Sequence, residues 1–236
     1  MKEIISTGGR SMRSLEKMMY AGLGVFLMVL FLSPVRVVGD ESVKLSSPPL
    51  PAKALEGLSV TDIASLEAGK IVVLKQDSGE GKNKKSLIKA SLLFDQPINK
   101  VWDMLKQTDR QKEYLPHLRV AKIIQGDNNG NITEFMLKIM FFNIRYRVDH
   151  KFDNAAYRLS WHLDPNYKND LKELYGYYQL YKVDDTHTLA RYGSKVDIGL
   201  LVPGFIEDAL TRKDLPTALG NVKKWIDSGG TFRKND

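Results

Sequence analysis

The stretch that decides the fold is IRYRVDHKF, residues 144–152. Its alternate members Ile144, Tyr146, Val148, His150 and Phe152 would share one face, and the four residues between them are all charged. Successive side chains of a β-strand point to opposite faces. The pattern therefore predicts a strand with one buried face, as is typical of antiparallel sheets.

The next stretch, YRLSWHL at residues 157–163, repeats this pattern, with Tyr157, Leu159 and Trp161 on the apolar face. Between 126 and 131 the sequence GDNNGN is a strong hairpin signal. Working outward from these two stretches, the same alternation and short apolar runs predict further strands at 71–74, 86–94, 119–125, 132–142, 174–183 and 188–198.

Helical spacing appears at two places in the chain. Ile98, Val101, Trp102 and Leu105 predict a helix after Pro97, followed by a second short helical piece over 110–114. After Pro203 one long helix is expected to about residue 228, with a single apolar stripe and a kink or local break at Pro216. Its expected apolar positions are Phe205, Ile206, Ala209, Leu210, Leu219, Val222, Trp225 and Ile226.

These elements predict an α+β, helix-grip fold, in which a curved antiparallel sheet wraps around a long C-terminal helix. Where side chains do not fill the space between sheet and helix, it becomes an apolar ligand cavity.

Several short motifs follow this order of elements. DQPINKVWDML (95–105) has the form P-x-x-x-V-W-x-x-L, and Tyr114-Leu115-Pro116 comes after it. GYYQL (176–180) resembles G-x-W-x-L, and TLARY (188–192) has the form T-x-x-x-Y. With Leu215-Pro216 and Trp225 in the last helix, the chain over 66–228 resembles the START-like (SRPBCC) helix-grip superfamily, especially its polyketide cyclase/dehydrase and coenzyme Q-binding branch.

The resemblance implies a cavity for a hydrophobic molecule such as a lipid, a quinone, or a sterol-like or polyketide-like compound. It transfers no catalytic residue, because the superfamily has no universal one, and it implies no cofactor. One departure is Tyr178, which stands where a tryptophan is common.

The N-terminal residues have the pattern of an export signal. Residues 1–17 are basic, residues 18–32 form an uncharged apolar run, and Val37-Val38-Gly39 supplies small residues before Asp40. This pattern predicts a signal peptide or an N-terminal membrane anchor over 1–39. The domain would then be periplasmic or anchored to the outer face of the cytoplasmic membrane.

The rest of the chain divides into three parts. A linker rich in proline and serine is expected over 40–65, with a short helix near 60–67. The START-like domain is expected over 66–228, and a flexible tail over 229–236.

Composition excludes several kinds of chemistry. The chain has no cysteine, which excludes disulfides, thiolate catalysis and cysteine-ligated metals. Of the net charge of +7, residues 1–39 contribute five basic and two acidic residues, which leaves a mild +4 for the rest. This distribution is unlike that of nucleic-acid binders. The basic cluster at Lys82, Lys84, Lys85 and Lys89 is interpreted as a solvated loop or as a contact for anionic lipid headgroups.

The candidate site is the apolar side of the sheet. His117, His150, His162 and His187 lack metal-ligand spacing, and neither a metal nor a catalytic residue is assigned. His150 is either a hydrogen-bonded strand-end residue or, with Tyr146, a polar pair inside the pocket. The apolar segment 197–205 is either a gate over the cavity mouth or a buried connector. The expected cavity-lining residues are Tyr146, Val148, His150, Tyr157, Leu159, Trp161, Tyr178, Tyr192, Phe205 and Leu210.

Three functions fit these observations. The first is a binding or carrier protein that holds a hydrophobic small molecule or lipid at a membrane surface. The second is a cyclase- or dehydratase-like enzyme that uses pocket tyrosine and histidine as acid and base. The third is an interaction module without a ligand, which would require bulky side chains in the cavity. The sequence leaves the oligomeric state open.

Overall fold

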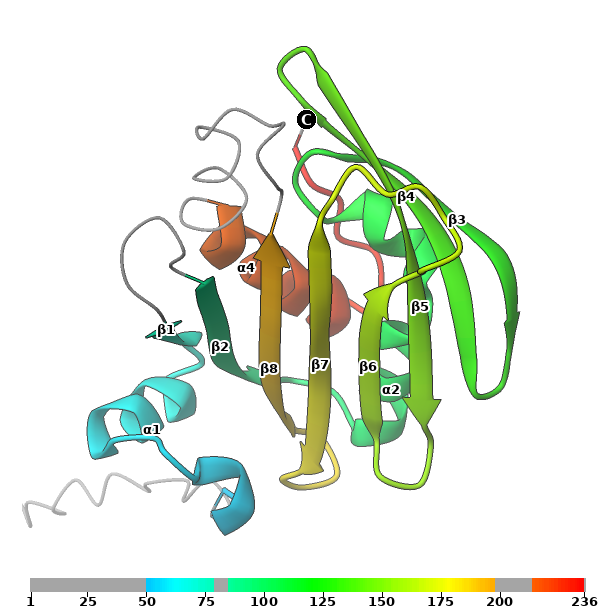
Figure 1. Cartoon of the computed structure of the whole chain (residues 1–236). Helices are drawn as coiled ribbons and strands as arrows, with labels where there is room; N and C mark the ends of the chain where they lie inside the picture. Colours follow the sequence, from blue (N-terminus) through cyan, green and yellow to red (C-terminus); the bar gives the residue numbers. More distant parts are fainter. Residues whose placement is uncertain (1–49, 79–84, 198–213, 236) are drawn as a thin grey trace, which may run out of the picture. The chain divides into compact units, whose positions relative to one another are not determined.

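All of the expected strands pair in one sheet. The computed structural model describes residues 50–78, 85–197 and 214–235. Within these residues the eight strands are antiparallel and follow the order β1-β2-β8-β7-β6-β5-β4-β3 (Figure 1). They are β1 (Val72–Ser78), β2 (Lys85–Phe94), β3 (Leu118–Asp127), β4 (Gly130–Ile139), β5 (Phe142–Asp153), β6 (Arg158–Leu163), β7 (Glu173–Lys182) and β8 (Thr188–Asp197).

The helical elements lie where the apolar spacing places them. Between β2 and β3 stand α2 (Ile98–Leu105) and the 3-10 helix η3 (Thr108–Glu113). The closing helix α4 is described over Asp214–Asp227, and Pro216 lies in its first described turn. The expected helical residues before Asp214 lie outside the described residues. The predicted α+β, helix-grip class is confirmed.

The C-terminal half of α4 is fixed to the sheet by a charged network. The Lys223 ammonium donates to the Leu93 carbonyl and to the Asp227 carboxylate, each at 2.6 Å. Asp227 in turn accepts the backbone N–H of Asp95 at 2.9 Å. Around this junction Trp102, Trp225 and Ile226 are buried in the main core with β2 and α2.

The expected linker is only partly a linker. Within it, residues 52–55 form the 3-10 helix η1 (Ala52–Leu55), and α1 (Val60–Glu67) begins with a capping box between Ser59 and Asp62. Ala54 and Leu66 are fully buried against Leu189 of β8. Leu189 and its neighbour Ala190 belong to different apolar clusters, which shows that these N-terminal elements cover the sheet face opposite the main core.

Residues of the expected flexible tail contact the domain. Lys234 donates its ammonium to the carbonyls of Leu115 and Leu118, and its backbone N–H to the Glu113 carbonyl. Phe232 packs against the main core. The tail is polar and follows Gly229 and Gly230, which is why its sequence resembles a disordered end.

Candidate functional site

A cavity of about 230 Å³ lies between the sheet and α4. Two apolar clusters border it. One is centred on α2 and the C-terminal half of α4, and the other lies on β4 and β5 with Leu118, Ala121 and Leu171. Strands β2 and β4–β8 contribute its walls, together with α2, the residues around η3, and the α4 residues Leu215, Ala218, Leu219 and Val222.

Most of the residues expected from the strand pattern line this cavity. They come from β5, β6, β7 and β8: Tyr146, Val148, His150, Leu159, Trp161, Tyr178 and Tyr192. Phe205 and Leu210, as well as the segment 198–205, lie outside the described residues.

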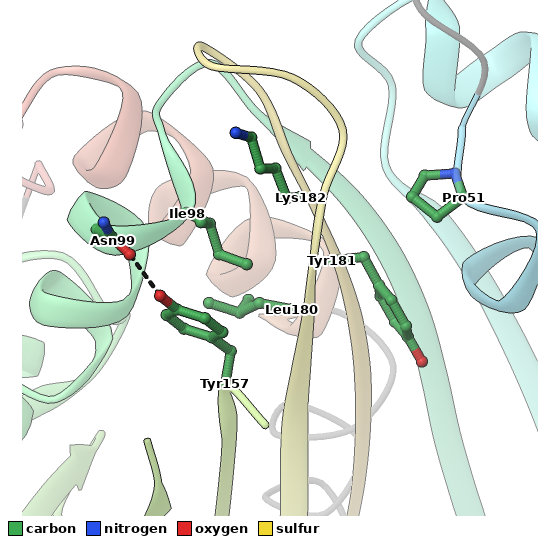
Figure 2. A pocket seen from close by; sticks show the side chains of 7 residues that line it. All are labelled: Pro51, Ile98, Asn99, Tyr157, Leu180, Tyr181 and Lys182. Carbon is green, nitrogen blue, oxygen red and sulfur yellow. Dashed lines mark hydrogen bonds between the residues drawn. The ribbon is translucent and has the colours of Figure 1, made fainter. Parts of the chain in front are cut away.

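Tyr157 does not line this cavity, which corrects the prediction. It precedes β6, and its positive φ of 50° removes it from the strand alternation that carries Leu159 and Trp161 inward. Instead Tyr157 borders an open depression with Ile98 and Leu180, and its hydroxyl donates to the Asn99 side chain at 2.5 Å (Figure 2). The ring also packs edge-on against Trp102.

Three aromatic rings form one wall of the cavity. The ring centroids of Trp161 and Tyr178 are 5.7 Å apart, those of Trp161 and Tyr192 5.9 Å, and those of Tyr178 and Tyr192 5.0 Å. Gly176 of β7 pairs with Trp161, and a Cβ there would collide with the indole. The glycine therefore lets the Trp161 ring lie over β7. Aromatic walls of this kind present a broad apolar surface with polar hydroxyls at defined points.

Among the described lining residues, only His150 has a buried side-chain polar atom without a hydrogen-bond partner. It is only 4% exposed, and its Nδ1 has no hydrogen-bond partner. The side chain of its cross-strand neighbour Asn131 belongs to a closed buried cluster, in which Thr108 and Thr133 hydrogen-bond to each other and to the Asn131 amide. The Asn131 backbone, by contrast, acts on the imidazole. Burial lowers the pKa of His150 to about 4, so the imidazole is neutral at pH 7.

No charged side chain lines the cavity among the described residues. Burial raises the pKa of Tyr114, Tyr146, Tyr178 and Tyr192, which keeps their phenols protonated. The described lining therefore offers neutral hydrogen-bonding groups in an apolar shell and no counter-charge.

A second hollow of about 150 Å³ adjoins the first at the start of β5 and β7. The two share Tyr146, Leu174, Val196, Leu215 and Ala218 among their lining residues. Leu118, Leu137 and Leu171 also line the second one, together with Leu115, Pro116 and His117. It extends the cavity toward the β4–β5 hairpin.

Some lining residues were not predicted. Phe135 is inward by the alternation of β4, a signal already present in the sequence. Tyr114 and Leu115 lie in the Y-L-P motif, which sequence reasoning assigned to packing alone. Gln111 and Ala218 carry no sequence signal, because a single glutamine and a small helix residue are common anywhere.

The described residues offer neither a metal-binding cluster nor a membrane-spanning helix. They hold no group of three or more histidine or acidic side chains placed to bind a metal. None of the described helices is long and apolar enough to cross a bilayer.

With a curved antiparallel sheet, a gripped C-terminal helix and a cavity between them, the chain has the START-like helix-grip fold, and solved structures of that fold resemble it. Human STARD10 is 15% identical over 77% of this chain and 82% of its own, with a TM-score of 0.55. A STAR-related lipid transfer protein from Xanthomonas axonopodis (fragment 25–204) is 8% identical over 64% and 98%, with a TM-score of 0.52.

A START superfamily protein from Mycobacterium smegmatis is 10% identical over 60% of this chain and 97% of its own, with a TM-score of 0.50. At these identities the similarity establishes the fold. No family model matches the sequence, and no curated protein matches it either.

Proposed function

We propose that this domain is a binding or carrier protein that holds an uncharged, largely hydrophobic small molecule in the cavity between the sheet and α4. The observation that carries the proposal is a roomy apolar cavity without a charged lining residue in the described part of the chain. Burying a charged group there would require a counter-charge, since an unpaired ion in an apolar interior is very costly. Affinity would come from burial of ligand surface, about 25 cal/mol per Å² before association costs.

The class of ligand follows from the same lining. A neutral lipid, a quinone or a polyketide-like compound would place its hydrocarbon against Trp161, Tyr178 and Leu219. A hydroxyl or carbonyl oxygen of the ligand would bond to His150 or to a phenol. One neighbour in fold is named a lipid transfer protein, which agrees with this class of ligand.

Two alternatives have less support. An enzyme of the cyclase or dehydratase kind would use Tyr146 and His150 as acid and base. The Phe135 ring packs against both, with centroids 5.4 and 6.1 Å away, and a histidine with a pKa of about 4 is a poor proton donor at pH 7. A ligand-free interaction module has no need of an unfilled cavity of this size.

We also propose that the domain works outside the cytoplasm, at the outer face of the membrane from which it is exported. The basic, apolar and small-residue segments of residues 1–39 support this location. A carrier placed there would exchange its ligand with the adjacent bilayer.

The test is native mass spectrometry of the full chain purified from its own host, followed by organic extraction. We expect one neutral hydrophobic molecule per chain. An empty protein that also takes up none of a panel of quinones, diacylglycerols and sterols would overturn the carrier function. A bound fatty acid or phospholipid would overturn the uncharged ligand class while keeping a carrier.

A further inference from the structure

The β4–β5 hairpin ends in an exposed apolar tip. Phe141 is 92% exposed, Met140 65% and Phe142 39%. Phe142 is the first residue of β5, and Ile139 pairs with it, so Met140 and Phe141 form a two-residue loop. Loops of this length favour asparagine, aspartate or glycine. Met140 instead adopts a positive φ of 52°, a backbone conformation that residues other than glycine and asparagine rarely take. The tip thus keeps large apolar side chains in a turn that local preference disfavours.

The opposite end of β4 is a natural comparison. There Asp127 pairs with Gly130, which makes another two-residue loop, and its residues Asn128 and Asn129 are polar. The same strand therefore begins at a polar tip and ends at an apolar one. Turn geometry does not require apolar residues at Met140 and Phe141.

The β4–β5 hairpin projects past the end of its neighbour β6 in the sheet (Figure 1). Strand β5 pairs with β6 only from Val148 onward, and residues 164–170 hydrogen-bond to the backbone of Arg145 and Arg147. Residues 142–144 therefore extend about 10 Å beyond these contacts. The second hollow lies at this same end, because it is lined by Leu137, whose partner in β5 is Ile144. The tip is therefore next to the end of the cavity that faces the hairpin.

We infer that the tip Met140–Phe142 inserts into the surface of an anionic lipid bilayer beside the cavity. A stable protein interface buries about 800 Å² on each partner. One aromatic side chain supplies at most about 250 Å², so three tip residues on a narrow hairpin are too small a surface for a protein partner. A fluid bilayer needs no complementary shape. Lys138 and Arg145 flank the tip, and no acidic residue lies between them, which suits anionic headgroups.

This inference rests on the proposed function for its purpose, the exchange of ligand with the membrane, but the insertion itself is measurable without any ligand. The experiment places a tryptophan at each tip of β4 in the full chain, as Phe141→Trp and as Asn128→Trp. Each variant is mixed with vesicles of phosphatidylcholine and phosphatidylglycerol whose acyl chains are brominated. Residues 1–49 are identical in both variants, so any binding through them is the same.

The emission of each variant is compared with that of the wild type, so that the signal of the introduced indole is isolated. We expect the indole of Phe141→Trp to shift its emission to the blue and to be quenched by the brominated chains, and the indole of Asn128→Trp to stay unchanged. No response of the Phe141→Trp variant, or an equal response of both variants, would overturn the inference. A blue shift of the Phe141→Trp variant that grows with protein concentration without vesicles would also overturn it, in favour of a second copy of the chain as the partner.

The link to ligand exchange is tested separately with Met140→Ser/Phe141→Ser. We expect this double variant to keep the ligand affinity of the wild type and to transfer ligand to vesicles at least several-fold more slowly. Failure of the wild type to bind any ligand would overturn the proposed function and leave the tip result intact. Transfer at the wild-type rate would overturn the role of the tip in exchange.

Discussion

The two halves of α4 face opposite kinds of interior. Trp225, near its C-terminus, is 0% exposed, stacks on Tyr114 at 4.6 Å and lies beneath the Arg110 guanidinium at 5.0 Å. Leu215 and Ala218, about two to three turns earlier, face the cavity. Both halves carry apolar residues at helical spacing, so the hydrophobic pattern alone does not distinguish a filled core from a hollow one.

The difference teaches what an aromatic residue does at each place. Around Trp225 both faces of the ring contact protein, and such packing stabilises the fold. Around Trp161, Tyr178 and Tyr192 the rings contact one another and also border empty space. Their contribution to stability is incomplete until a ligand supplies the missing contacts.

The largest effect is expected at the filled end. Trp225→Ala should lower the free energy of unfolding by about 3–5 kcal/mol, because it deletes a fully packed ring and leaves a void. Trp161→Ala should cost clearly less in the ligand-free protein, since part of that ring already borders empty space. Urea unfolding of both variants checks the contrast, and equal losses would show that the two regions are packed alike.

The next effect concerns the hollow end. Ala218→Phe should fill the cavity from α4 and lower ligand affinity at least about a hundredfold, or about 2.8 kcal/mol. A ring of this size occupies most of a cavity of about 150 Å³, and the main cavity beneath the sheet is about 230 Å³. The matched control is Thr217→Phe, which adds the same ring to the exposed side of α4. Equilibrium binding of the co-purified ligand is the measurement, and equal affinity in both variants would move the ligand elsewhere.

The inward-facing residues at both ends were largely predictable from the sequence. The strand alternation around residues 144–163 predicted the inward face of β5 and β6, and helical spacing predicted Trp225 and Ile226 as buried. Period and polarity carry this information because they depend on local geometry alone. Tyr157 failed for a local reason as well, since it adopts a left-handed conformation just before its strand.

The empty space itself was less predictable, because it depends on side-chain volumes summed across elements distant in sequence. Neither Ala218 nor Gln111 has a sequence pattern that predicts a position in a cavity wall. The buried ends of the domain were missed for a related reason. Ala54 and Lys234 gain partners only from strands and turns far along the chain, so their polar or proline-rich surroundings look like linker and tail.

A third effect is a pH dependence that arises at the hollow end. The pKa of His150 falls from 6.5 to about 4 on folding, mainly by burial, with a smaller effect of His162 in the same direction and an opposing one from the Asn131 backbone. Between these values the unfolded chain binds more protons, so stability is complete above pH 6.5 and is lost as the pH falls toward 4. From pH 7 to pH 5 the loss should be roughly 2 kcal/mol.

The control for this effect is His150→Leu, which removes the titrating group. Urea unfolding at pH 7 and pH 5 should show the wild type losing more stability than the variant. The same pH dependence in both proteins would mean that other groups cause it. Such a result would place the imidazole in a wetter environment than its 4% exposure implies.

The smallest expected effect concerns His150, whose replacement by leucine should raise stability and lower ligand affinity. In the ligand-free protein, His150→Leu removes the unpartnered Nδ1 and should raise the free energy of unfolding at pH 7 by about 1 kcal/mol. The same change removes a hydrogen bond to the ligand, so affinity should fall about two- to tenfold, the usual range for one such bond. His150→Gln keeps a hydrogen-bonding side chain at this position and should recover most of the affinity without the gain in stability. Thermal unfolding and equilibrium binding of the three proteins measure both quantities.

If leucine raises stability and leaves affinity unchanged, the ligand bonds to the phenols instead. If leucine lowers stability, the folded chain holds the imidazole through a hydrogen-bond partner.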